Sequence, residues 1–91
     1  MPRFSGQILS RDGDVIASNA DILINFFQIG SLTYWSGSFS LPRLPQFEPQ
    51  KGSFNIQLND GRKGTISIKE FTMDSRTGEW NIQFENDGPL E

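Results

Sequence analysis

The residues best suited to contacting a charged partner follow a tight turn. Asp60-Gly61 has the composition of a hairpin loop, in which glycine accepts a positive φ at little steric cost. Arg62 and Lys63 follow directly, so the turn would present two cations, unless these serve only to keep the hairpin solvated and to block edge pairing. A hairpin of this kind, together with an exposed sheet edge, would suit a protein partner. The predicted partner-binding residues are Tyr34, Arg43, Arg62, Lys63 and Lys69.

The composition excludes the commonest catalytic and metal-binding chemistries. The chain has no histidine and no cysteine, so it has neither a Ser-His or Cys-His nucleophile pair nor a usual zinc site. Its glycines form no phosphate-binding pattern. Asp12 and Asp14 share a turn, but the other ligands of a calcium loop are missing. We therefore expect a protein that is not an enzyme and has no catalytic residue, cofactor or metal ion.

A second set of polar residues suggests a different ligand. Two segments alternate amide and apolar side chains, and their amides are Asn55, Gln57, Asn81 and Gln83. Amides both donate and accept hydrogen bonds, which suits sugar hydroxyls, and Tyr34 could add a flat stacking surface. Such rows also occur on ordinary strands, and both tryptophans look buried. Carbohydrate or polymer binding through this amide face is the alternative to a protein partner.

The charge is unevenly distributed along the chain. The net charge of −3 argues against binding through phosphate attraction, so nucleic acid is the weakest candidate partner. Residues 43–69 hold five cations against two carboxylates, whereas residues 70–91 hold six carboxylates against one arginine. We expect these segments to be neighbouring strands whose charges cancel.

Several features indicate a single domain without a membrane segment. The chain has 91 residues, and its longest apolar cluster, 22–27, is far too short to cross a bilayer. The beginning of the sequence lacks the apolar run of a secretion signal, which together with the absence of cysteine slightly favours the cytoplasm. We interpret residues 1–89 as one β domain and 90–91 as the remnant of a cloning junction.

Period-two alternation dominates the second half of the chain. Residues 54–58, 66–68 and 80–84 place apolar side chains at every second position, which is typical of strands with one buried face. Asp12-Gly13, Asp60-Gly61 and residues 75–78 predict hairpin turns between strands. These reversals indicate an antiparallel meander.

The first half of the chain leaves more alternatives. Residues 19–29 fit a helix that begins at Asn19 and ends at Gly30, but they also fit a strand buried on both faces, which we favour. Within 31–41, Gly37 indicates a bulge or a close approach of backbones. Residues 42–52 contain three prolines and predict a stiff loop, with Leu44 or Phe47 covering an open end of the barrel.

Together these patterns predict an all-β fold. We expect a small antiparallel β-barrel or compact β-sandwich of six to seven strands, joined mainly by hairpins. The best functional hypothesis is a non-enzymatic protein-interaction module that uses a sheet edge and the charged hairpin, and a homo-oligomer through an edge strand is a further possibility. The predicted core is Phe4, Ile8, Ile24, Trp35, Phe39, Phe54, Ile56, Leu58, Ile66, Ile68, Trp80, Ile82 and Phe84.

Overall fold

Alternating apolar and polar residues build six antiparallel strands. The computed structural model describes residues 3–42 and 50–91. Its strands are β1 (Arg3–Leu9), β2 (Val15–Ile29), β3 (Leu32–Leu41), β4 (Gly52–Leu58), β5 (Lys63–Met73) and β6 (Trp80–Asn86). No helix in the described part of the chain is long and apolar enough to cross a membrane. The predicted caps of the barrel, Leu44 and Phe47, lie outside the described residues.

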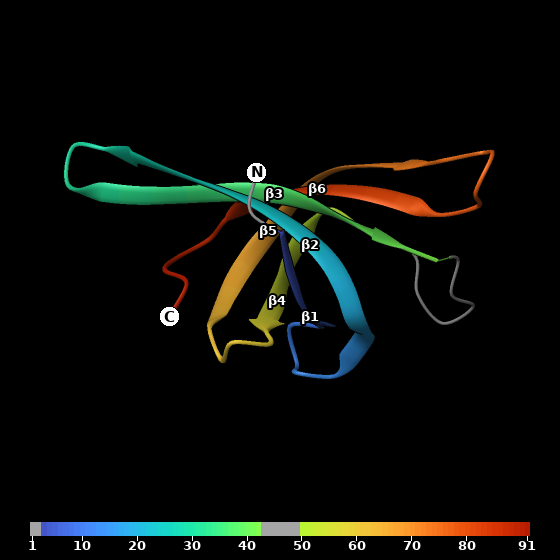
Figure 1. Ribbon diagram of the computed structural model, residues 1–91, viewed down its shortest axis with the longest axis horizontal. Coiled ribbons are helices and arrows are strands. Elements are labelled where there is room, and N and C mark those ends of the chain that lie inside the picture. Colours follow the sequence, from blue (N-terminus) through green and yellow to red (C-terminus); the bar gives the residue numbers. More distant parts are fainter. Residues whose placement is uncertain (1–2, 43–49) are drawn as a thin grey trace.

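The six strands close into one barrel in the order β1-β2-β3-β6-β5-β4. Two meanders, β1-β2-β3 and β4-β5-β6, meet twice, because β1 pairs with β4 and β3 pairs with β6, both antiparallel. In Figure 1, β1 and β4 cross below β3 and β6. The all-β prediction is therefore confirmed, and the barrel, not the sandwich, is the form that the sheet takes.

The predicted turns join the strands as expected. The amides of Gly13 and Gly61 each donate to the carbonyl three residues back, at 3.0 Å, and both glycines have positive φ, +93° and +97°. These two three-residue loops thus have the same geometry, with glycine in the position that an L side chain rarely adopts. The looser turn at residues 75–78 is closed by Asp74 N–H donating to Glu79 C=O at 2.9 Å.

Residues 19–29 belong to strand β2, so the strand interpretation is confirmed and the helical one is wrong. The expected burial on both faces is wrong, because residues 25–29 are exposed. Asn19, the proposed start of that helix, instead has φ +56° at a register shift between β1 and β2. Asparagine tolerates this left-handed conformation better than most residues. The extra residue bends β2 locally, while its pairing with β1 continues on both sides of the shift.

The barrel interior is filled by apolar side chains, as predicted for most of the core. The prediction of full burial is wrong for Phe4, Phe54 and Trp80, which are half-buried and pack against the core. Three other residues complete the core instead: Ala20, Ile22 and Leu41. The ring of Phe84 contacts the rings of Trp35 and Phe39, with centroid distances of 6.1 and 5.8 Å respectively.

Gly37 marks a close approach of two backbones. It lies opposite Ile24 in an unbroken β2–β3 register, so no bulge occurs there. A Cβ at this position would overlap the carbonyl oxygen of Leu23 and lie 3.1 Å from the Cα of Ile24. The close-approach prediction is therefore confirmed, and its cause is the contact between β3 and β2.

Two hairpins extend beyond the barrel in opposite directions, which gives the molecule its long dimension of 41 Å. In Figure 1 the β2–β3 hairpin projects to one side and the β5–β6 hairpin to the other. Within residues 3–42 and 50–91, β3 is paired with β6 as far as Ser36 opposite Glu85, and β2 is paired with β1 as far as Leu23 opposite Arg3. Beyond these points the β2–β3 hairpin is a two-stranded ribbon.

We expect Gly37→Ala to be among the most destabilising single methyl additions in this chain. The added carbon meets backbone atoms, which cannot move aside as a flexible side chain could, so the free energy of unfolding should fall by at least about 3 kcal/mol. Urea unfolding followed by tryptophan fluorescence measures this. The neighbouring Ser38→Ala should change stability by no more than about 0.5 kcal/mol. Equal stability of the two variants would contradict the close-approach argument.

Candidate functional site

The part of the β2–β3 hairpin that pairs with neither β1 nor β6 among the described residues, residues 24–35, is hereafter called the arm. Its base still contributes Ile24 and Trp35 to the barrel core. Its register places Phe27 opposite Tyr34 and Ile29 opposite Leu32, so these four side chains share one face. Phe27 and Tyr34 stack, with ring centroids 5.8 Å apart and planes at 12°. Ile29 and Leu32, at the tip, are 63% and 59% exposed. The arm therefore presents an apolar face to solvent.

The arm carries no charge. All the charged residues of the chain lie outside residues 22–42, and this uninterrupted neutral stretch was the sequence signal that could have revealed the arm. Isolated strand edges in natural proteins are usually protected by lysine, proline or a bulge. None of these occurs in residues 24–29 or 32–35. The edges of the arm are thus open to pairing with another strand.

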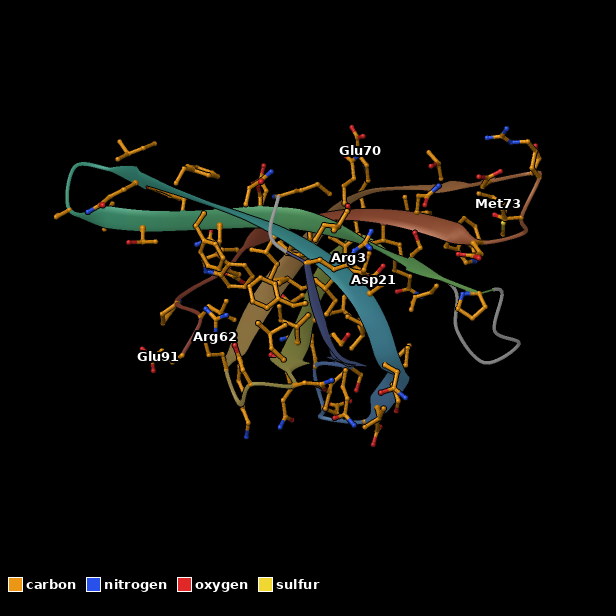
Figure 2. All side chains as sticks on the ribbon, in the orientation of Figure 1. Arg3, Asp21, Arg62, Glu70, Met73 and Glu91 are labelled. Carbon is orange, nitrogen blue, oxygen red and sulfur yellow. The ribbon has the colours of Figure 1, made fainter. Side chains whose placement is uncertain are left out.

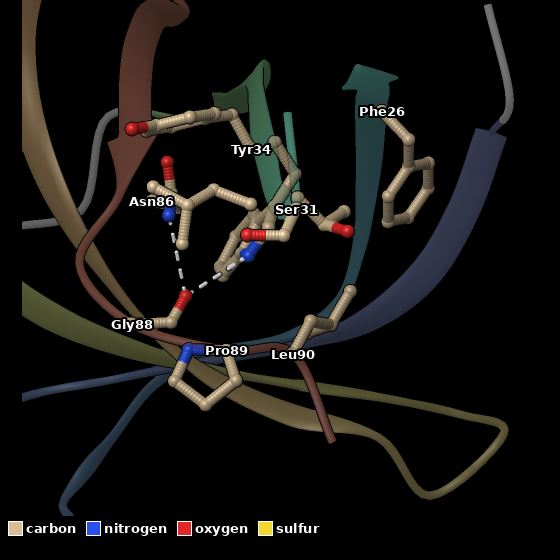
Figure 3. Close-up of a pocket in the computed structure, with 10 residues that line it drawn as sticks. Phe26, Ser31, Tyr34, Asn86, Gly88, Pro89 and Leu90 are labelled. Carbon is tan, nitrogen blue, oxygen red and sulfur yellow. Dashed lines mark hydrogen bonds between the residues drawn. The ribbon is translucent and has the colours of Figure 1, made fainter. Parts of the chain in front are cut away.

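A groove of about 540 Å³ runs between the arm and the segment after β6. Figure 3 shows Phe26, Ser31 and Tyr34 on the arm side and Asn86, Gly88, Pro89 and Leu90 on the other. The groove forms because β6 parts from β3 after Glu85 and turns toward β5, where Asp87 N–H donates to Thr65 C=O at 2.8 Å. Among the described residues, none that lines the groove is charged.

The floor of the groove is held by the buried indole of Trp35. Its Nε1–H donates to the carbonyl oxygen of Gly88 at 3.1 Å, and Asn86 Nδ2 donates to the same oxygen at 3.3 Å. Gly64 makes room for the indole, because a Cβ there would lie 2.9 Å from the Trp35 ring. Leu90 packs against the core beside it. These contacts fix the groove wall opposite the arm.

Arg62 folds back onto its own chain. Its Nε and Nη2 both lie 2.9 Å from Oδ2 of Asp60, while its guanidinium carbon lies 5.0 Å from the ring centre of Phe4 and 5.8 Å from that of Phe26. A cation over aromatic faces is stabilised by the ring quadrupole. Figure 2 shows Arg62 below the arm, on the barrel. Arg62 thus joins the β4–β5 turn to the base of the arm, an arrangement that we call the arginine clasp.

The structure does not gather the predicted partner-binding residues into one surface. Lys63 is exposed at the start of β5, where its backbone N–H and C=O pair with Glu91 at 2.6 and 2.9 Å. Lys69 lies at a bulge of β5, in a shallow polar depression that also includes Glu85. Tyr34 is half-buried on the arm, and Arg43 lies outside the described residues. Of the four that lie within the described residues, Tyr34 alone lines the groove.

The amide face is also divided. Asn55 lies opposite Thr65 and Asn81 lies opposite Thr72, so the two amide pairs are at opposite ends of β5, roughly 20 Å apart at the usual strand rise. Asn55 accepts from Thr65 Oγ1 at 3.0 Å and donates to Ser10 C=O at 3.2 Å. Asn81 accepts from Ser40 Oγ at 2.9 Å. Gln57 and Gln83 line different depressions.

The charged groups of the described residues form ion pairs but no metal-binding cluster. Within residues 3–42 and 50–91, no three His, Cys, Asp or Glu side chains are close enough to hold a metal ion. The ion pairs of this part of the chain are Arg3–Asp21, Arg62–Asp60 and Arg76–Asp74. The first and last involve largely exposed arginines, which makes their contribution small.

The arginine clasp should make stability depend on pH through Asp60. The side-chain hydrogen bond from Arg62 holds the pKa of Asp60 below its ordinary value of 3.8. A carboxyl whose folded pKa is lowered stabilises the protein above its unfolded pKa, and this stabilisation is lost as the pH falls through the folded pKa. The wild type should therefore exceed Asp60→Asn in stability near about pH 7, and the difference should vanish near about pH 2.

Urea unfolding of both proteins at the two pH values measures this difference. Asp12→Asn is the matched control, because Asp12 has the same place in the other three-residue turn and no arginine partner among the described contacts. A stability difference between wild type and Asp60→Asn that is the same at both pH values would mean that the ion pair does not stabilise the fold.

Comparison with known proteins assigns no role to this site. No protein-family model matches the chain, and neither a curated protein nor a solved structure is significantly similar to it. The function of the arm and its groove must therefore be argued from their own chemistry.

Proposed function

We propose that the protein is a non-enzymatic protein-interaction module and that the arm is its partner-binding surface. The observation that carries this proposal is a charge-free hairpin that projects from a closed barrel with Phe27, Ile29 and Leu32 exposed to solvent. Large exposed apolar patches are uncommon on monomeric proteins and usually mark sites of interaction.

The position of the apolar side chains supports this role. The barrel core is complete without Phe27, Ile29 and Leu32, which are 46%, 63% and 59% exposed. A ribbon of two strands is at best marginally stable in water unless its apolar side chains pack against something. A partner that covers this face would bury area on the arm and also order it.

The charged hairpin contributes less directly than its sequence suggests. Arg62 is occupied by Asp60 and by two aromatic rings, so it positions the arm and is not a free cation. Lys63 is exposed, and with Glu91 it lines a different depression from the groove beside the arm. Replacing Arg62 would disturb the base of the arm, whereas Lys63→Glu changes a surface charge alone.

The proposal predicts that a charged arm tip abolishes partner binding. Ile29→Lys combined with Leu32→Glu puts an opposite-charge pair at two directly opposed positions, which keeps the hairpin but removes its apolar tip. A protein captured from the lysate of the source cells by the immobilised wild type should be retained at least about tenfold less by this variant. Quantitative mass spectrometry of the retained proteins is the measurement.

The matched control makes the same change on the other hairpin. Thr72→Lys combined with Asn81→Glu also puts opposite charges on two exposed, directly opposed residues. This control and Lys63→Glu should both retain the partner. An empty set of captured proteins, or one that is equal for all the variants, would contradict the proposal, provided that each variant unfolds at the same urea concentration as the wild type.

A further inference from the structure

The free edge of β3 lies along the groove. Within the described residues, Leu32–Trp35 have β2 as their ladder partner on one side and the groove on the other. Gly30-Ser31 is a two-residue loop with Gly30 at φ +63°, so Ile29 and Leu32 form the pair that exchanges both backbone hydrogen bonds. Antiparallel alternation then turns the N–H and C=O of Thr33 away from β2 and toward the groove.

The arm tip and the groove have matching properties. Ile29 and Leu32 at the tip are the most exposed large apolar side chains among the described residues. The groove has an apolar lining of Phe26, Trp35, Pro89 and Leu90, and its described residues carry no charge. The tip residues Ser31 and Leu32 already line the groove of their own molecule, so they cannot also fill it. A second molecule can do so.

Charge also favours a second copy at this position. Each chain has a net charge of −3, so two copies repel each other at most orientations. The stretch of residues 22–42, which includes the whole arm, has no charged side chain. Two copies that meet arm to arm therefore avoid placing like charges in contact.

We propose that the arm binds a second copy of this chain about a two-fold axis. The β3 edges pair antiparallel, with Thr33 opposite Thr33 of the second copy, and each arm tip enters the groove of the other. This register places Leu32 of each copy opposite Tyr34 of the other, an aliphatic–aromatic pair of the kind that stabilises sheets. Because the two copies use the same patch, the assembly closes at a dimer. The proposal rests on the proposed function, since it names the partner of the arm.

The register can be tested by a disulfide, because the natural chain has no cysteine. In a hydrogen-bonded antiparallel pair the Cα atoms are about 5.5 Å apart, which is within the reach of a disulfide. Thr33→Cys should therefore form a covalent dimer on mild oxidation at micromolar concentration. The control is Gln28→Cys, which lies directly across the arm but points its backbone to the opposite edge. It should cross-link at least about tenfold more slowly.

Sedimentation velocity over a range of concentrations tests the backbone pairing. The wild type should form a dimer whose fraction rises with concentration. Thr33→Pro removes an N–H that β2 does not use, so the arm should remain while dimerisation weakens at least about tenfold. Thr33→Ala keeps the N–H and should dimerise like the wild type. Gln28→Pro makes the same change on the β2 edge and should also dimerise.

Three results would overturn the proposal: a wild type that is monomeric at every concentration, equal dimerisation of Thr33→Pro and Thr33→Ala, or equal cross-linking of the two cysteine variants. If Thr33→Pro does not retain the wild-type unfolding midpoint, the disulfide experiment decides alone. A monomeric wild type whose arm still captures a different protein would overturn the self-pairing and leave the interaction module standing. Capture that is independent of the arm tip would overturn the module itself.

Discussion

The close contact of β3 with β2 at Gly37 is the constraint on which the rest of the structure depends. The backbones there are too near for any side chain, because a Cβ would overlap the Leu23 carbonyl. On one side of this contact, β2 and β3 bend into the barrel and bury Ile22, Phe39 and Leu41. On the other side they contribute Ile24 and Trp35 to the core and then leave it as the arm, and β6 parts from β3 one residue after Gly37. The closed core, the projecting hairpin and the groove therefore share one origin.

Two groups of contacts hold the base of the arm in place, and they differ in chemistry. The arginine clasp is a surface arrangement, in which Arg62 is pinned by Asp60 and covers Phe4 and Phe26. The Trp35 indole is buried, and its hydrogen bond to Gly88 ties the arm to the segment after β6. Because Phe26 and Trp35 are directly opposed in the β2–β3 ladder, their side chains share one face, and the two arrangements hold the same point of the hairpin on that face. The base of the arm is thereby preorganised, which reduces the entropy that binding must overcome there.

Sequence patterns predicted local features well where the cause is local. The hairpin turns at Gly13 and Gly61 followed from the freedom of glycine at positive φ, and strand β6 followed from alternation about Ile82. Prediction was poorer where the cause is the position of a residue along the barrel. Phe54 and Trp80 alternate as core residues do, yet they lie half-buried, since a strand can extend beyond the interior that its neighbours enclose. Two of the candidate cations are separated for the same reason: Lys63 and Lys69 share a strand but not an environment.

By itself, the sequence determined an all-β chain with defined turns, a requirement for glycine at position 37, and an absence of the side chains that the common catalytic and zinc chemistries need. These properties depend on neighbours in the chain or on composition. Tertiary structure alone decided that Arg62 would be bound to its own domain, that the apolar residues between Phe26 and Tyr34 would be outside the core, and that a groove would open beside them. The physical reason is that closure of the barrel sets how much of each strand is enclosed. That length depends on pairing between residues far apart in the chain, such as Ser36 with Glu85, which no local pattern encodes.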